Sequence, residues 1–115
     1  MEYVALIYVD EKQFDGLSPD EQRAIFAEYG AVTEGFRSAG VYVDGRPLQG
    51  IAEATSVRVR DGKSVITDGP FAETKEHLGG FYLFECANLD DALRYAAKIP
   101  GARYGTIEVR PVLPV

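Results

Sequence analysis

The sequence predicts an α+β fold of the ferredoxin-like (split βαβ) type, an antiparallel sheet with two helices on one of its faces. Two observations predict it. The expected elements follow the order β-α-β-β-(β)-β-α-β, in which both helices cross between strands of one sheet. In addition, two runs of strand length, 3–9 and 81–86, are apolar at nearly every position, as in strands that are covered on both faces.

The chain should begin with a strand and a long helix. Residues 3–9, YVALIYV, are rich in β-branched and aromatic side chains, and 10–17 is expected as a polar connection. Ser18 is placed as an N-cap and Glu21 completes a capping box, so a helix should follow and end near Ala39. The apolar residues of this helix share one face: Ile25, Tyr29, Val32 and Phe36.

A hairpin is expected in the middle of the chain. Residues 41–43 begin an extended stretch that should end in a turn at 44–47. The alternating segment 55–60, the Asp-Gly pair at 61–62 and the return at 64–67 then predict a β-hairpin.

The C-terminal half should contribute a loop, two strands and the second helix. Residues 68–80 are expected as a loop with one helical turn at 73–76. The run 81–86 is a strand, 88–99 a helix that an asparagine caps, and 106–110 the closing strand.

The apolar strands predict a homodimer. Two helices cover only one face of a sheet, and the runs 3–9 and 81–86 require a cover on the other face as well. A second copy of the sheet, related by a two-fold axis, is the simplest cover. The alternative is a long loop that folds over the sheet.

Composition narrows the class of protein. The 115 residues are expected to form one domain, 1-115. A net charge of −6 argues against nucleic acid as a partner, and no apolar run approaches the ~20 residues of a membrane span. The single cysteine, Cys86, favours a reducing cytoplasm. No metal constellation or cofactor motif stands out, so the chemistry expected is free of metals and cofactors.

The densest cluster of functional groups spans 67–77. It holds Asp68, several further acids, a lysine and His77, the chain's one histidine. A carboxylate here that is partly buried would have a pKa suited to proton transfer. The alternative is structural, because Asp-Gly-Pro is first a turn and Glu-x-Lys-Glu a solvated helical turn.

This cluster carries a resemblance to a known family. Residues 68–76, DGPFAETKE, followed by LGGF at 78–81, resemble the signature of the DGPF-domain branch of the YCII-related proteins. Further matches are ATSVR at 54–58, alanine positions in the second helix, and EVRP at 108–111. The likeness covers nearly the whole chain.

The resemblance implies a ferredoxin-like protomer that pairs sheet to sheet into a dimeric α/β barrel. Related enzymes act on small cyclic or aromatic compounds, and some members are encoded near extracytoplasmic-function sigma factors. Their proposed acid/base group includes a histidine on the first helix, paired with an aspartate. This chain has no histidine there, and Tyr29 occupies the place by register.

Two main functions remain open at this stage. The first is a cytoplasmic, cofactor-independent acid/base enzyme that binds a small organic molecule between sheet and helices. The second is a non-catalytic ligand-sensing or regulatory module associated with a sigma factor; plain structural dimerisation is a third reading. The candidate catalytic residues are Asp68, Tyr29 and His77, and the candidate substrate-binding residues are Arg58, Tyr8 and Phe71. For Arg58 a salt bridge, and for Tyr8 core or dimer packing, are the alternatives.

Overall fold

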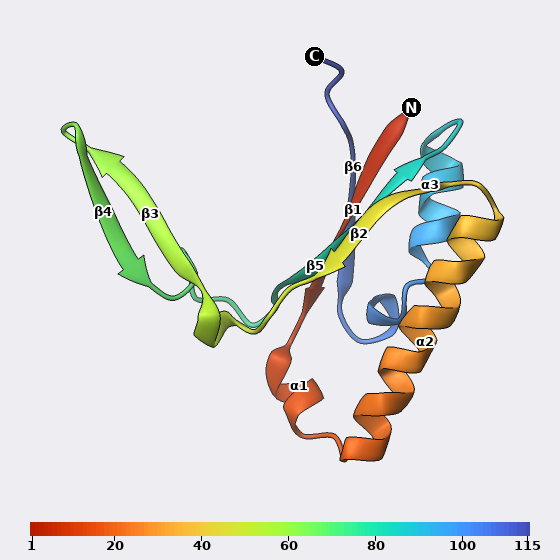
Figure 1. Cartoon of the computed structure of the whole chain (residues 1–115), viewed down its shortest axis with the longest axis horizontal. Helices are drawn as coiled ribbons and strands as arrows, with labels where there is room; N and C mark the ends of the chain where they lie inside the picture. Colours follow the sequence, from red (N-terminus) through yellow and green to blue (C-terminus); the bar gives the residue numbers. More distant parts are fainter.

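The computed structural model describes residues 1–115 and contains a four-stranded antiparallel sheet. Its strands are β1 (Glu2–Val9), β2 (Tyr42–Pro47), β5 (His77–Glu85) and β6 (Thr106–Pro111), in the order β2-β5-β1-β6 (Figure 1). With both terminal strands beside each other and the crossover elements between, this order matches the predicted split βαβ arrangement. The α+β class and the antiparallel sheet are confirmed.

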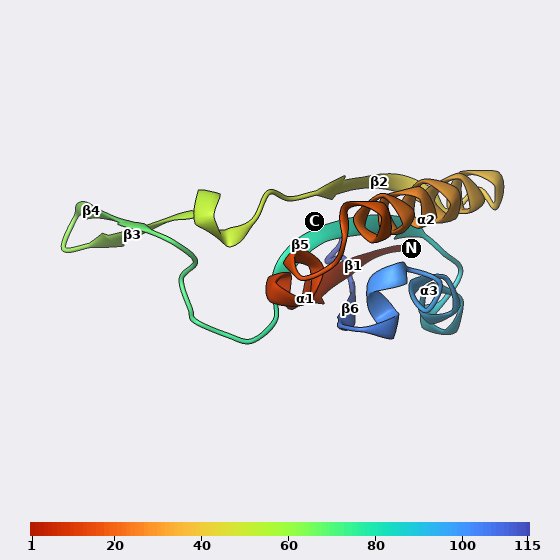
Figure 2. The ribbon, with the colours of Figure 1, turned by 90° about the horizontal axis from the view of Figure 1, so that it is seen from below.

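Two helices pack on one face of the sheet, as predicted: α2 (Pro19–Ser38) and α3 (Leu89–Ala96) (Figure 2). A third helix, α1 (Glu11–Asp15), corrects the expected polar connection. It forms because the Asp10 side chain accepts a hydrogen bond from the Lys12 amide and caps the turn. The chain also has two short 3₁₀ helices, η1 (Ile51–Glu53) and η2 (Pro100–Arg103). None of the helices combines the length and apolar character of a membrane span.

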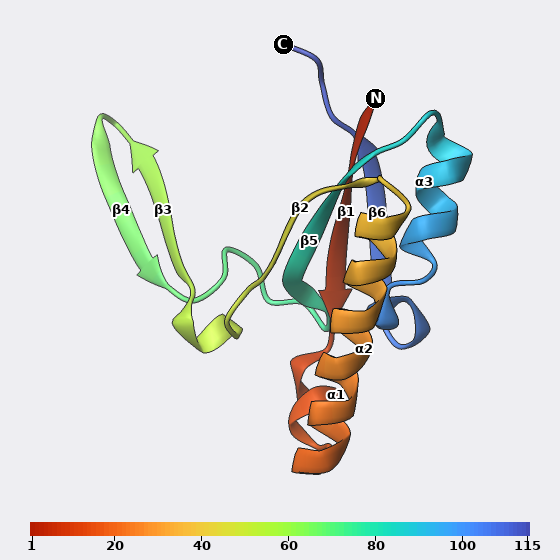
Figure 3. The same cartoon turned by 45° about the vertical axis from the view of Figure 1, so that its right-hand side comes forward.

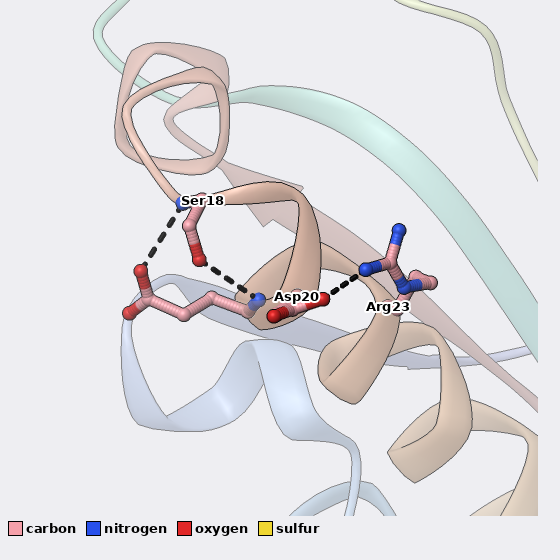
Figure 4. A network of polar contacts seen from close by, with 4 residues as sticks. Ser18, Asp20 and Arg23 are labelled. Atoms are coloured by element: carbon pink, nitrogen blue, oxygen red, sulfur yellow. Dashed lines mark hydrogen bonds and ion pairs between the residues drawn. The ribbon is translucent and has the colours of Figure 1, made fainter.

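The start of α2 confirms the capping box. The Ser18 hydroxyl accepts from the Glu21 amide, and the Glu21 carboxylate accepts from the Ser18 amide, both at 3.1 Å. Asp20 and Arg23 form an ion pair on the next turn (Figure 4). The helix begins at the predicted residue because two of its free amides are satisfied there.

The core lies between the sheet and the helices. Phe36 of α2 is buried and its ring meets those of Tyr82, Phe84 and Tyr95 edge to face or nearly so, with centroids 4.9 to 6.0 Å apart. Ala92 and Ala96 bring α3 onto the same cluster. Aromatic edge-to-face contacts of this kind add to the free energy gained by burial.

Two boundaries around β2 and β5 were predicted wrongly. Residues 44–47 continue β2 instead of turning, and β5 begins at His77, with no helical turn at 73–76. The glycines explain the first error: a Cβ on Gly45 would meet the Tyr82 ring at 2.8 Å, and one on Gly80 would meet the Arg46 carbonyl oxygen at 2.8 Å. These glycines therefore allow β2 and β5 to approach closely. In the sequence, a glycine that allows such an approach looks the same as one that marks a turn.

The other face of the sheet carries apolar side chains without a cover. In β1 the buried residues alternate with partly exposed ones, and in β5 the same alternation continues. The register places the partly exposed residues together: Val4 opposite Leu83 and Leu6 opposite Phe81. We call the set formed by Val4, Leu6, Tyr8, Phe81 and Leu83 the bare face.

The predicted hairpin is present and projects from the sheet. Strands β3 (Thr55–Arg60) and β4 (Lys63–Asp68) form a separate two-stranded sheet, joined by Asp61 and Gly62 with φ of 52° and 74°. We call residues 55–68 the arm and the rest of the chain the body. All three cartoons show the arm on the side of the sheet opposite to α2 and α3, standing off the sheet (Figures 1 to 3). It does not fold over the bare face, so the loop cover considered above is not observed.

Candidate functional site

A cavity of about 1210 Å³ lies between α1, α2 and strands β1, β2 and β5. It exists because α2 packs tightly only near its C-terminal end, where Phe36 is buried, whereas Phe26 is 62% exposed. Figure 3 shows α1 and the first turns of α2 extending beyond the end of β1. The volume is slightly above the usual range of about 300–1,000 Å³ for small-molecule sites.

Helix α1 is held in place as one wall of this cavity. The Glu11 carboxylate accepts a hydrogen bond of 2.8 Å from the Ile51 amide, which ties α1 to η1. The rings of Phe14 and Phe26 meet edge to face with centroids 5.5 Å apart, and Gln22 donates to the Phe14 carbonyl oxygen. These contacts give the wall an apolar inner surface with fixed position.

Tyr29 supplies the cavity's most distinctive polar group. Its hydroxyl oxygen accepts a hydrogen bond of 3.2 Å from the Gly101 amide, and its own proton has no acceptor in the protein. Burial, followed by the repulsion between the Tyr29 and Tyr104 phenolates, raises the pKa of Tyr29 to about 12. The hydroxyl therefore stays protonated at neutral pH and has a hydrogen bond to donate.

Two neighbouring hydroxyls, those of Thr33 and Tyr82, are already engaged. The Thr33 hydroxyl donates to the Tyr29 carbonyl oxygen at 2.7 Å and lies 2.6 Å from the Tyr82 hydroxyl. Since the Thr33 proton is used on the backbone, the Tyr82 hydroxyl is the donor of the second bond. Burial raises the pKa of Tyr82 and that of Tyr104 as well. Tyr29 therefore keeps a proton to donate, and so does Tyr104, whose hydroxyl also belongs to a residue that lines the cavity.

Most carboxylates that line the cavity have structural partners. Asp10 caps α1, Glu11 holds the Ile51 amide, Glu21 belongs to the capping box, and Glu28 pairs with Arg103. Hydrogen bonds from Ser18 lower the pKa of Glu21. Asp15, the fifth, is exposed and makes no such bond. The four partnered carboxylates hold the walls of the cavity in place.

The predicted site residues fall in different places. Tyr29 lines the cavity, but Arg58 and Asp68 lie exposed on the arm and Phe71, 81% exposed, lies in the loop that follows it. None of these three lines the cavity. Arg58 makes no ion pair with a neighbouring strand, and the Tyr8 side chain belongs to the bare face.

His77 begins β5, opposite Val9 of β1. Its Nε2 atom is buried and has no hydrogen-bond partner, although the side chain is only partly buried as a whole. A buried ring nitrogen without a partner is uncommon and costs free energy. The neighbouring Glu76 carboxylate accepts from Thr106 at 2.9 Å.

Sequence reasoning missed Thr33, Tyr104 and Gly101 as parts of the site. The spacing of Tyr29 and Thr33, four residues apart, was available as a signal that both lie on one side of the helix. Gly101 gave no signal, because its contact with Tyr29 joins residues 72 positions apart. No three or more His, Cys, Asp and Glu side chains gather closely enough to hold a metal ion.

The fold and the cavity together define a ferredoxin-like α+β protein with a pocket of small-molecule size between α2 and the sheet. The model of the YCII-related domain matches residues 1–115, and the chain belongs to this family. An uncharacterized protein of Rhizobium meliloti (strain 1021) is 38% identical over 114 residues, which cover 97% of this chain and 92% of that protein.

Proposed function

We propose that the cavity binds a small, mostly apolar organic molecule, cyclic or aromatic, that carries a hydrogen-bond acceptor such as a carbonyl oxygen. The unengaged proton of Tyr29 in a largely apolar pocket is the observation that carries the proposal. A partly buried donor without an acceptor in the protein gains a hydrogen bond when a ligand supplies the acceptor. The surrounding Ile7, Val9 and Ile25 supply the apolar contact.

In its enzymatic form, the proposal is a cofactor-independent acid/base reaction. Tyr29 would hydrogen-bond the carbonyl oxygen of the substrate and stabilise the negative charge that develops there when a base removes a proton from the adjacent carbon. His77, which lies opposite the cavity-lining Val9, is the proposed base, and its unpartnered Nε2 supports its inclusion. Asp68, Arg58 and Phe71 do not line the cavity and take no part in this proposed reaction.

A ligand-sensing or regulatory module is the second candidate. The observation that favours it is the commitment of Asp10, Glu11, Glu21 and Glu28 to structural hydrogen bonds and an ion pair. Groups held in this way fix the cavity and do not exchange protons readily with a ligand. This candidate binds the same class of molecule and does not convert it.

We further propose that the chain is a cytoplasmic homodimer of the dimeric α/β barrel type, within the DGPF branch of its family. The bare face supports the dimer, since five partly exposed apolar side chains lie beside one another there on β1 and β5. The motif at 68–76 supports the branch, and the free thiol of Cys86 supports a reducing compartment.

A matched pair of ligands tests the binding proposal. Acetophenone and α-methylstyrene have nearly the same shape, but only acetophenone carries a carbonyl oxygen. Calorimetric titration should show acetophenone binding about tenfold more tightly, as expected for one hydrogen bond. Tyr29→Phe should erase the difference, and Tyr95→Phe, outside the cavity, should keep it. Equal affinities for both ligands in the unaltered protein would contradict the proposal.

Deuterium exchange separates the two candidates. An acid/base enzyme should exchange the methyl hydrogens of bound acetophenone with D₂O faster than buffer does, which NMR detects. His77→Gln should slow this exchange at least about tenfold, whereas Asp68→Asn, on the arm, should leave it unchanged. Binding without exchange favours the ligand-sensing module.

A further inference from the structure

The arm has one apolar face and one basic face. The register pairs Val57 with Ile66 and Val59 with Ser64, so Val57, Val59 and Ile66 share a face. They are 65%, 63% and 68% exposed, which is unusual for three adjacent large apolar side chains. The opposite face carries the cations Arg58, Arg60 and Lys63.

The arm has little in the body to hold it. A two-stranded ribbon is marginally stable by itself in water. The bonds that close its base, Gly69 amide to Ala54 carbonyl and Ser56 hydroxyl to Gly69 carbonyl, lie within the arm and its connections. The radius of gyration is 16.0 Å, against about 13 Å for a compact chain of this length. The arm therefore has the form of an element that packs on something outside its own protomer.

Charge favours a second copy as that partner. The arm has a net charge of +1, because it holds three cations (Arg58, Arg60 and Lys63) and two acids (Asp61 and Asp68). The whole chain has a net charge of −6, so the net charge of the body is −7. An arm that is basic on one face is attracted to an acidic body of the same chain, and two such bodies repel less with the arms between them.

Position favours the same partner. The bare face and the arm lie on the same side of the protomer, opposite to the helices (Figures 1 and 2). A copy placed against the bare face by a two-fold axis would lie where the arm extends. By symmetry, each arm then reaches the other protomer.

We propose that the arm is a dimerisation arm, which docks by Val57, Val59 and Ile66 on the body of a second copy of this chain. The proposal rests on the dimer proposed above and adds a second contact to it. Exchange of two arms would hold the dimer more firmly than the bare faces do by themselves, because each arm removes further apolar surface from water.

Sedimentation equilibrium on matched variants tests it. Val57→Ser/Ile66→Ser removes the register pair from the apolar face, whereas Val65→Ser changes a neighbouring valine on the opposite face. The double variant should raise the dimer dissociation constant at least about 100-fold, and the control should change it little. A control that weakens the dimer as much as the double variant does would overturn the proposal.

The outcome also separates this proposal from the sheet-face dimer. If the protein is a dimer that Leu6→Ser weakens and the arm variants leave intact, the sheet-face dimer stands and the arm proposal is wrong. A monomer at all micromolar concentrations overturns both. Hydrogen exchange needs no variant: amides of residues 55–68 should become more protected as protein concentration rises, and protection independent of concentration contradicts docking.

Discussion

The body and the arm use similar side chains in opposite ways. In the body, Phe36 and its neighbours are buried between sheet and helix, and they hold the fold of one protomer together. In the arm, Val57 and Ile66 are largely exposed and contribute little to that fold. The difference shows that apolar content alone does not identify a core. What matters is whether a second layer of the same chain covers it.

The largest expected effect separates these two regions by stability. Phe36→Ala should lower the free energy of unfolding by about 3–5 kcal/mol, because it opens a cavity among packed rings. Val57→Ala, measured by urea titration in dilute protein, should lower it by less than about 0.5 kcal/mol. Comparable losses in the two variants would show that the arm belongs to the core of one protomer.

A second substitution tests the close approach of β2 and β5, where the sequence had predicted a turn. Gly80→Ala should cost about 1–3 kcal/mol, since its Cβ would meet the Arg46 carbonyl oxygen at 2.8 Å. Gly35→Ala in α2 is the control, as nothing lies within 4 Å of the added carbon. The control should be neutral or stabilising by up to about 1 kcal/mol. A neutral Gly80→Ala would mean that β2 does not pair with β5 here.

Tyr29→Phe should cost about 1–2 kcal/mol, because it leaves the Gly101 amide without its acceptor. It should also change the alkaline limb of the stability curve. The folded-state pKa of Tyr29 is raised from 10.0 to about 12, so its contribution is complete below pH 10 and is lost as pH rises towards 12.

Thermal unfolding between pH 9 and 12 measures how the contribution of Tyr29 to the stability of the body depends on pH. The unaltered protein should lose stability more steeply across that window than Tyr29→Phe does. Parallel curves for the two proteins would show that the hydroxyl is not buried as described.

The smallest effect on global stability is expected in the arm. Gly62 has a φ of 74°, which a residue with a Cβ adopts at a cost of about 1 kcal/mol. Gly62→Ala should therefore increase hydrogen exchange in residues 55–68 and leave the melting temperature of the body unchanged at low concentration. A clear fall in the melting temperature would show that the arm and the body unfold as one cooperative unit, which contradicts this prediction.

Local signals in the sequence predicted the elements that depend on local contacts. The capping box at Ser18 and the Asp61-Gly62 turn were correct because each is decided within a few residues. The course of β2 through 44–47 was missed, since it depends on pairing with a strand about 40 residues away. Short α1 was missed because its single side-chain cap is a weak signal within a polar segment.

The candidate site could be predicted only in part. Tyr29 was named because, by register, it takes the place of the histidine that the family resemblance puts on the first helix, and it does line the cavity. Asp68 and Phe71 were named because functional groups are dense around them, but density along the chain does not show which segments meet in space. The bond between Tyr29 and Gly101 depends on tertiary packing, and no motif announces it.

The claim that ligand binds in the cavity of the body, and not on the arm, is tested most directly by an NMR titration of ¹⁵N-labelled protein with acetophenone. Amides of Tyr29, Gly101 and residues 11–15 should shift as the ligand enters the cavity, and amides of residues 55–68 should stay where they are. Shifts confined to the arm, with the amides around Tyr29 unmoved, would contradict the assignment of the cavity as the ligand site.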